Sequence, residues 1–178
     1  MPSNFTVTVP RLQTERFVLR EYRPDDFEAF AAHLADPESM QHLNLSDRKT
    51  AWRVFGSHAG LWVLGGAGWW AIEKRDTGEL VGNVGAFYRD GDPTLEIGWN
   101  TYKAFWGQGI AGEAARAVLD YVFDVRRESR VHALIDDGNR ASIRVAENLG
   151  LSYGGETAFN GKTTGTYVLE RGATGKRD

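Results

Sequence analysis

The sequence Trp106-Gly107-Gln108-Gly109-Ile110-Ala111-Gly112 stands between a predicted strand and a predicted helix. The strand covers Thr94 to Asn100, where apolar residues alternate with other residues, and the helix runs from about Gly109 to Val125, with apolar residues every three or four positions. Unpaired backbone N–H groups and the positive end of the helix dipole meet at such a helix start. The stretch therefore predicts a phosphate-binding loop, and a loop that only lets the helix pack tightly is the alternative.

The three glycines also match the pattern G-x-G-x-x-G of dinucleotide-binding proteins, and Asp136 follows at the end of the next predicted strand. Two observations oppose this interpretation. Residues 101–106 separate the strand from the first glycine, and the chain after Gly112 is too short for the usual doubly wound sheet. A Walker-type loop fails because Glu113 and Ala114 stand where phosphate transfer needs Lys and Ser or Thr.

The elements on both sides of this loop predict a mixed α/β fold. Before it, the patterns indicate a strand at Arg16 to Tyr22 and a helix that opens at Pro24-Asp25-Asp26. A second helix follows at Asp47 to about Leu64, and then a hairpin formed by Trp69 to Lys74 and Leu80 to Tyr88. After it, they indicate a strand at Val131 to Ile135 and a helix at Asn139 to Leu149, ended by Gly150. Two closing strands follow at Leu151 to Phe159 and Thr163 to Glu170. Antiparallel strands followed by a strand–helix–strand crossover predict a mixed, mostly antiparallel sheet with helices on both faces.

Length and composition limit the kind of protein. The 178 residues fit one domain, which we place at 1–170, followed by a flexible polar tail at 171–178. The absence of cysteine excludes disulfides and thiolate metal ligands, and the net charge of −3 gives no basic surface for nucleic acid. The N-terminus lacks a signal-peptide pattern, and the longest apolar stretch, Leu61 to Ile72, is too short to span a bilayer. We therefore predict a cytoplasmic protein with neither nucleic acid nor membrane as a partner.

Five blocks of the sequence are informative when taken in their order and spacing. They are Leu12-Gln13-Thr14-Glu15-Arg16-Phe17-Val18-Leu19-Arg20, Glu96-Ile97-Gly98-Trp99, Trp106 to Ala114, Asn139-Arg140-Ala141-Ser142 and Asn148-Leu149-Gly150-Leu151. Together they resemble the GNAT acyltransferase superfamily, in the branch that includes the ribosomal-protein N-terminal acetyltransferases of the RimJ/RimL type, and the resemblance extends over residues 11–170. The sequence departs from the superfamily at Trp106, usually Gln or Arg, and at Gly112, usually Thr, but neither change removes a backbone donor.

The resemblance implies a sheet splayed between the fourth and fifth predicted strands, 94–100 and 131–135, with acetyl-CoA as co-substrate in the resulting V and no metal. Backbone amides from Gln108 to Gly112 would hold the pyrophosphate, and the backbone of Trp99, Asn100 and Thr101 would pair with the pantetheine amides. The implied cofactor-binding residues are Trp99, Asn100, Thr101, Gly107, Gln108, Gly109, Ile110, Ala111, Gly112, Asn139 and Ser142.

Acetyl transfer to an amine needs an unprotonated nucleophile, a polarised carbonyl and a proton for the departing thiolate. We predict that Glu96 is the base, acting directly or through water, because it lies on the strand face opposite Leu95, Ile97 and Trp99. A solvated strand carboxylate is the alternative. A backbone N–H near Trp99 or Asn100 would polarise the carbonyl. The resemblance implies that Ser142 serves the thiolate, the alternative being a local role at a helix start capped by Asn139. Weaker candidates are Tyr153 as acid, and Asp92 and the four histidines as bases.

Adjacent Trp69 and Trp70 must point to opposite faces of their strand, and we predict that Trp70 lines the acceptor site. The predicted function is an acetyl-CoA-dependent N-acetyltransferase in which an amine attacks the thioester directly within a ternary complex. The acceptor is a protein N-terminus or a small amine, and a homodimer is compatible with the sequence. A non-catalytic acyl-CoA sensor and a dinucleotide-binding protein are the alternatives.

Overall fold

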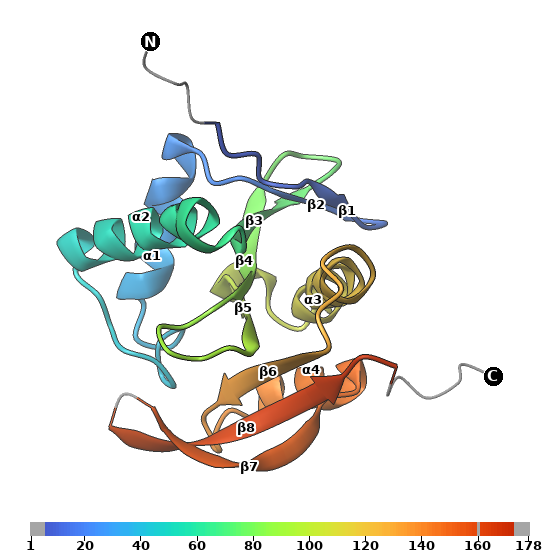
Figure 1. Cartoon of the computed structure of the whole chain (residues 1–178). Coiled ribbons are helices and arrows are strands. Elements are labelled where there is room, and N and C mark those ends of the chain that lie inside the picture. Colours follow the sequence, from blue (N-terminus) through green and yellow to red (C-terminus); the bar gives the residue numbers. More distant parts are fainter. Residues whose placement is uncertain (1–5, 160, 173–178) are drawn as a thin grey trace.

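The computed structural model describes residues 6–159 and 161–172, and Figure 1 shows the course of the chain. Within these residues the elements follow in the order β1 (Leu12–Gln13), β2 (Phe17–Arg20), η1 (Pro24–Asp26), α1 (Phe27–Ala35), α2 (Arg48–Gly65), β3 (Gly68–Lys74), β4 (Leu80–Phe87), β5 (Leu95–Thr101), η2 (Lys103–Phe105), α3 (Ile110–Asp120), η3 (Tyr121–Val125), β6 (Arg130–Ile135), α4 (Arg140–Leu149), β7 (Ser152–Phe159) and β8 (Lys162–Glu170). The predicted strands and helices are all present, and β1 and η2 are elements that the sequence patterns did not indicate.

The strands form one sheet in the order β1-β2-β3-β4-β5-β6-β8-β7. All neighbouring strands are antiparallel except β5 and β6, which are parallel and joined through α3. The prediction of a mixed, mostly antiparallel sheet is confirmed. The alternative of a doubly wound dinucleotide fold is wrong, because that fold needs a parallel sheet and a glycine directly after a strand, whereas Gly107 follows the turn η2.

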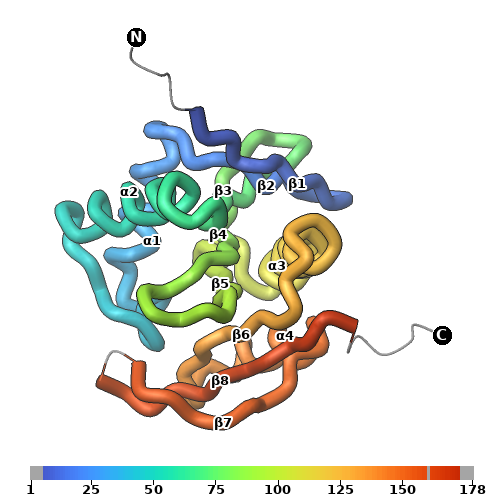
Figure 2. The backbone as a smooth tube through the Cα atoms, viewed as in Figure 1, coloured from blue at the N-terminus to red at the C-terminus, as the bar shows by residue number. Residues whose placement is uncertain are grey.

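The sheet divides between β5 and β6. These strands pair only at Leu95 with Val131 and at Glu96 with His132, and beyond these two residue pairs they separate. Figure 2 shows the strands β1 to β5, in blue to green, on one side of this division and β6, β8 and β7, in orange to red, on the other. The predicted splay is thereby confirmed, and its open end lies at the carboxyl ends of β5 and β6.

Helices cover both faces of the sheet, as predicted (Figure 1). One face carries the main core, in which apolar side chains of β3, β4 and β5 pack against α3, and α4 packs against α3 and β6. Its fully buried members include Trp70, Val84, Ile97, Ile110 and Val118. The other face is covered by α1 and α2, which share a smaller aromatic core built from Phe27, Phe30, Ala31, Ala51 and Phe55. Burial of these rings contributes on the order of 1.5–3 kcal/mol for each side chain.

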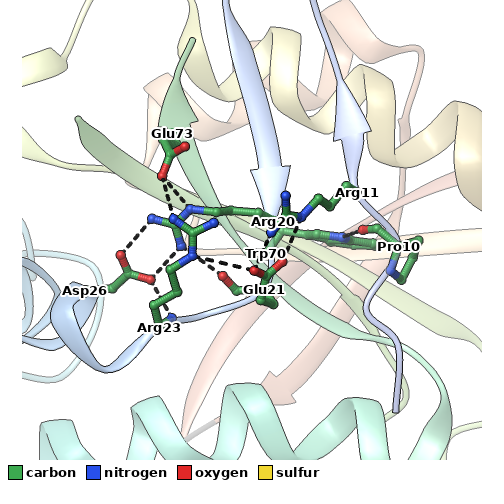
Figure 3. A network of polar contacts seen from close by, with 8 residues as sticks. All are labelled: Pro10, Arg11, Arg20, Glu21, Arg23, Asp26, Trp70 and Glu73. Carbon is green, nitrogen blue, oxygen red and sulfur yellow. Dashed lines mark hydrogen bonds and ion pairs between the residues drawn. The ribbon is translucent and has the colours of Figure 1, made fainter. Parts of the chain in front are cut away.

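A buried arginine fastens the start of α1 to the sheet (Figure 3). The Arg20 side chain, from β2, is 3% exposed and donates two hydrogen bonds to the carboxylate of Asp26, at 2.7 and 2.8 Å. Its Nε also donates to Glu73 of β3 at 2.5 Å. A buried charge is tolerated only where it is paired and hydrogen-bonded, and Arg20 meets that condition on both sides. The contacts fix α1 over the face of the sheet opposite α3.

Helix ends follow the capping residues that the sequence supplies. The side chain of Asp47 accepts a hydrogen bond from the Thr50 amide at the start of α2, and that of Asn139 accepts one from the Ser142 amide at the start of α4. Gly150 ends α4 with φ +95°, in the left-handed region that favours glycine, as predicted. The predicted helix from Gly109 to Val125 is α-helical to Asp120 and then continues as one turn of π-helix.

Two predictions concern the ends of the chain and the membrane. Of the predicted polar tail, 171–178, the residues from 173 onward lie outside the part that the structure describes. Within 6–159 and 161–172, no helix has the length and apolar character needed to cross a bilayer.

Candidate functional site

The division between β5 and β6 leaves part of a strand edge without a partner. In the described part of the chain, no strand pairs with the β6-facing edge of β5 from Ile97 to Thr101. An extended molecule that carries amide groups can bind such an edge as an additional strand. This edge includes the three residues predicted to bind pantetheine, Trp99, Asn100 and Thr101.

The glycine-rich loop lies at the open end of this V, between η2 and α3. Gly107 and Gly109 have φ values of +76° and +73°, in the left-handed region where a side chain is strained. Gly109 is the N-cap of α3, so the next amides, from Ile110 to Gly112, belong to the first turn and have no acceptor within the helix. These amides and the helix dipole form the arrangement that binds phosphate groups at helix starts.

An ionic contact from the N-terminal segment holds this loop, and our sequence analysis did not anticipate it. The carboxylate of Glu113, in the first turn of α3, accepts hydrogen bonds from the Thr14 hydroxyl at 2.6 Å and from the Arg16 amide and Nε at 3.0 and 2.7 Å. The Arg16 guanidinium also donates to the carbonyl of Gln108 at 3.0 Å. Burial alone would raise the pKa of Glu113, but the bonds from Thr14 and Arg16 outweigh it and lower that pKa. The contact fixes the loop against β1 and β2.

Trp106 closes the other side of the loop. Its indole Nε1 donates to the carbonyl of Thr101 at 2.7 Å, so the ring ties the start of the loop to the end of β5. The side chain is 42% exposed. Trp106 therefore has a local structural role, since its indole joins the start of the loop to the end of β5.

The start of α4 faces the same open end from the β6 side. Asn139 caps the helix through the Ser142 amide, at 3.1 Å, which is the alternative that we considered for this pair. The Ser142 side chain is half-buried, and its predicted role at the cofactor sulfur stays a prediction. Tyr153, the weaker candidate for an acid, is exposed on β7 and its ring packs edge-on against that of Tyr167.

Glu96 is buried rather than solvated, with 5% of its surface exposed. Its two carboxylate oxygens accept hydrogen bonds from Nε and Nη2 of Arg89, the latter at 2.8 Å. The His132 ring lies 3.8 Å away, and its Nε2 is also 3.7 Å from Asp92. Burial alone would raise the pKa of Glu96, but His132 and Arg89 outweigh it, and the pKa is lowered. Glu96 thus keeps its negative charge, and both of its oxygens are engaged.

The prediction that Trp70 lines the acceptor site is wrong. The two neighbouring tryptophans do point to opposite faces, but Trp70 is 0% exposed in the main core, where its Nε1 donates to the Pro10 carbonyl at 2.6 Å (Figure 3). Trp69 instead turns toward α2 and stacks on His58, with ring centroids 4.4 Å apart. The sequence could not decide between them, because both rings are largely buried.

Trp69 lines an open cavity of about 350 Å³ beside the Glu96–Arg89 pair. The other lining residues are Ser57, His58, Leu61, Phe87, Tyr88, Arg89 and Asp90. Gly85 and Gly98 make room for the Trp69 ring, because a Cβ at either position would lie within 3 Å of it. Burial lowers the pKa of His58 to about 3, so its ring is neutral at pH 7. The cavity therefore combines aromatic walls with a cationic and an acidic side chain.

The described residues contain no group of three or more His, Cys, Asp or Glu side chains arranged to hold a metal ion. The site therefore has three parts: a strand edge open to an extended ligand, a helix start suited to phosphate, and a cavity on the face of the sheet that α2 covers.

Comparisons with known proteins agree with this geometry. The family model described as an acetyltransferase (GNAT) domain matches residues 16–152. YoaA of Bacillus subtilis, named as an uncharacterized N-acetyltransferase, is 30% identical over 145 residues, which cover 79% of this chain and 82% of that protein. The B. subtilis protein YkkB is 44% identical over 90 residues, about half of each chain, with 49% and 52% covered.

Solved structures share the fold. An acetyltransferase from Agrobacterium tumefaciens is 28% identical with a TM-score of 0.81, and the match covers 96% of this chain and 99% of that one. A ribosomal L7/L12 alpha-N-protein acetyltransferase, RimL, in complex with coenzyme A has a TM-score of 0.77 at 17% identity, with 92% and 99% covered. The second likeness concerns the fold alone.

Proposed function

Because this chain belongs to the GNAT acetyltransferase family, we propose that it is an N-acetyltransferase that moves an acetyl group from acetyl-CoA to a primary amine. The observation that carries the proposal is the V between β5 and β6, with the glycine-rich loop at its open end. The amine attacks the thioester directly in a ternary complex, and no covalent enzyme intermediate is needed.

The residues present fit coenzyme A. Amides from Ile110 to Gly112 would bind the pyrophosphate, and the free edge of β5 would pair with the amides of the pantetheine arm. A backbone N–H near Trp99 or Asn100 would polarise the thioester carbonyl without the use of a side chain. The Glu113–Arg16 contact supports the proposal, since it holds the loop in place before the ligand arrives.

Ser142 remains our candidate for returning a proton to the thiolate, since it lies on the first turn of α4 at the open end of the V. Glu96 remains the base predicted from the sequence, and its carboxylate is ionised, as a base must be. Each of its oxygens already accepts a hydrogen bond from Arg89, so an acceptor amine or a bridging water would share the carboxylate with the guanidinium.

The cavity at Trp69 supports a small amine or the first residue of a peptide as acceptor. Its volume of about 350 Å³ lies near the lower end of the range of small-molecule sites. Asp90 supplies negative charge at its rim, and the aromatic walls can contact an ammonium group or an apolar body.

The test combines binding and turnover. CoA or acetyl-CoA at 100 times its Kd should stabilise the protein by about 2.7 kcal/mol, which raises Tm by roughly 5–10 °C at this size. Release of the CoA thiol should then follow addition of an amine from a panel of short peptides and small amines. Stabilisation by NAD without stabilisation by CoA would refute the proposal, and CoA binding without turnover on any amine would favour an acyl-CoA sensor.

A further inference from the structure

His58 of α2 lies in the wall of the cavity of about 350 Å³, which Arg89 also lines. Its ring stacks on Trp69, with ring centroids 4.4 Å apart and an interplanar angle of 7°. The Trp69 ring stacks in turn on Phe87 at 5.3 Å, and Phe87 pairs across the sheet with Glu96. His58 therefore lies over the same face and the same part of the sheet as the predicted base.

The imidazole is held on several sides. Trp69 leaves it no room to move toward the sheet, because that ring already lies close over Gly98. The Phe30 ring meets the imidazole edge-on at 5.6 Å, and the Tyr22 hydroxyl is hydrogen-bonded to Nδ1 at 3.2 Å. Three aromatic neighbours and one hydrogen bond thus fix the orientation of the His58 ring.

The hydrogen bond with Tyr22 determines which ring nitrogen carries the proton. Burial raises the pKa of Tyr22, so its hydroxyl keeps its proton, and within the described part of the chain its one hydrogen-bond partner is Nδ1 of His58. A hydroxyl that donates to Nδ1 requires the neutral tautomer with its proton on Nε2. The reverse assignment would leave the Tyr22 proton without an acceptor, which costs about 1–3 kcal/mol.

The Nε2 nitrogen of His58 has no hydrogen-bond partner among residues 6–159 and 161–172, yet it is not enclosed. The polar side-chain atoms that are enclosed without a partner belong to His33, Asn83, Tyr102 and Arg126. The His58 ring borders the cavity, so its Nε2–H is available to a molecule bound there. Because burial lowers the pKa of His58 to about 3, the ring is a neutral donor at pH 7 rather than a base.

The charges of the cavity indicate what kind of molecule fits beside this donor. Arg89 donates to both oxygens of Glu96, so these two charges balance, and Asp90 adds a negative charge at the rim. The cavity therefore suits a cationic amine rather than an anion. A neutral N–H pairs with a carbonyl or hydroxyl oxygen, and in a cavity of this size that oxygen must lie within a few bonds of the amine.

We propose that His58 determines the specificity of the acceptor site, by donating a hydrogen bond from Nε2 to an oxygen that the acceptor carries next to its amine. The inference rests on the proposed function and deepens it. The favoured acceptors are amines with a carbonyl group on the neighbouring carbon, as in amino-acid amides and peptides, over alkyl amines and polyamines. Tyr22 is a positioning residue, because it fixes the proton on Nε2.

The experiment compares two acceptors of the same shape. Alaninamide and 3-methylbutan-2-amine differ only in that two methyl groups replace the oxygen and nitrogen of the carboxamide. CoA thiol release is measured for each and expressed per concentration of unprotonated amine, since the carboxamide lowers the pKa of its amine. The wild-type protein should favour alaninamide in kcat/KM by about tenfold, the contribution of one hydrogen bond.

Variants of the pair locate this preference. His58→Phe keeps a ring on Trp69 but removes the donor, so kcat/KM should fall about tenfold for alaninamide and stay near the wild-type value for the alkyl amine. The double variant Tyr22→Phe/His58→Phe removes both partners, leaves no hydroxyl unpaired, and should show the same loss in a folded protein. Tyr22→Phe alone should keep part of the preference, because the ring then adopts either tautomer. Ala59→Ser, at the exposed next residue of α2, is the control and should keep all of it.

The proposal is overturned if the wild-type protein does not prefer alaninamide, or if the folded double variant keeps the preference. An equal loss with both acceptors would also overturn it, because His58 would then only support the shape of the cavity. Failure of the proposed function has a different signature, since the wild-type protein would then release no CoA thiol with any amine of the panel. That result would refute both the proposed function and this inference, whereas a missing preference would refute this inference alone.

Discussion

Replacement of Gly109 by Val tests whether the loop at the start of α3 binds the pyrophosphate. Gly109 has φ +73°, and an ordinary L-residue there costs about 1–2 kcal/mol, with a β-branched residue at the upper end. Space is not the obstacle, because the nearest atom to an added Cβ is Arg16 Nη2 at 3.7 Å, an ordinary contact. The cost therefore arises in the backbone itself.

The variant must either carry this strain or shift the loop. If it carries the strain, Tm falls by roughly 2–8 °C for a domain of this size. If the loop shifts, the amides from Ile110 to Gly112 lose their common direction and the Kd for CoA rises, by about tenfold for each 1.4 kcal/mol of lost binding. Calorimetric titration with CoA and a thermal melt of the same samples measure both effects.

Two further variants identify the cause. Gly109→Asn tolerates the left-handed conformation, so weaker CoA binding at normal Tm would show that a side chain crowds the phosphate. Gly56→Ala is the matched glycine control, since it lies in the middle of α2 with nothing within 4 Å of the added Cβ, and it should keep the wild-type Kd. A Gly109→Val protein with unchanged Kd and unchanged Tm would refute the argument for this loop.

Three other predictions test single side chains of the structure. Glu113→Gln should cost about 1 kcal/mol of stability, because its partner Arg16 is largely exposed, and should raise the KM for acetyl-CoA several-fold; an unchanged KM would show that the loop needs no such contact. Trp70→Phe should lower Tm and leave the acceptor KM unchanged, whereas Trp69→Phe should alter the acceptor KM; the reverse would return Trp70 to the acceptor site. His33 is a buried residue of α1, and burial lowers its pKa from 6.5 to about 4. Between these values the unfolded chain binds a proton that the folded chain does not, so the free energy of unfolding should decrease as the pH is lowered, by at most about 1.4 kcal/mol per pH unit. Urea titrations at pH 7 and pH 5 should therefore show a larger loss of stability for the wild type than for His33→Asn.

The main elements of the fold could be predicted because their signals are local. Asp47, Asn139 and Gly150 mark helix ends through their own hydrogen bonds or φ values, and the residues around Gly78 mark the β3–β4 hairpin. The splay between β5 and β6 rested on resemblance instead, since no pattern along one strand reports where its neighbour departs. The π-helical turn after Asp120 also has no local signal that we could identify.

The candidate site was harder to predict because its contacts join distant segments. The Arg16–Glu113 pair links residues more than 90 positions apart, so no spacing rule along the chain could find it. Glu96 was placed on the correct face, but its partner Arg89 comes from the turn before the strand and changes what the carboxylate can do. The choice between Trp69 and Trp70 depended on which face of the sheet α2 packs against, and that packing is a feature of the tertiary structure that a local pattern does not report.

The free edge of β5 has a consequence for the behaviour of the protein in a crowded solution. Exposed strand edges invite pairing with other chains and hence aggregation, and many proteins protect them with charges, prolines or covering segments. Here the unpaired edge is half-buried and faces β6, which diverges from it beyond the shared pairs at Leu95 and Glu96. A slender extended molecule can enter from the open end, whereas a foreign strand with its own side chains meets the second arm of the sheet. The unpaired edge of β5 is thus open to a small extended ligand but protected from pairing with a strand of another protein chain.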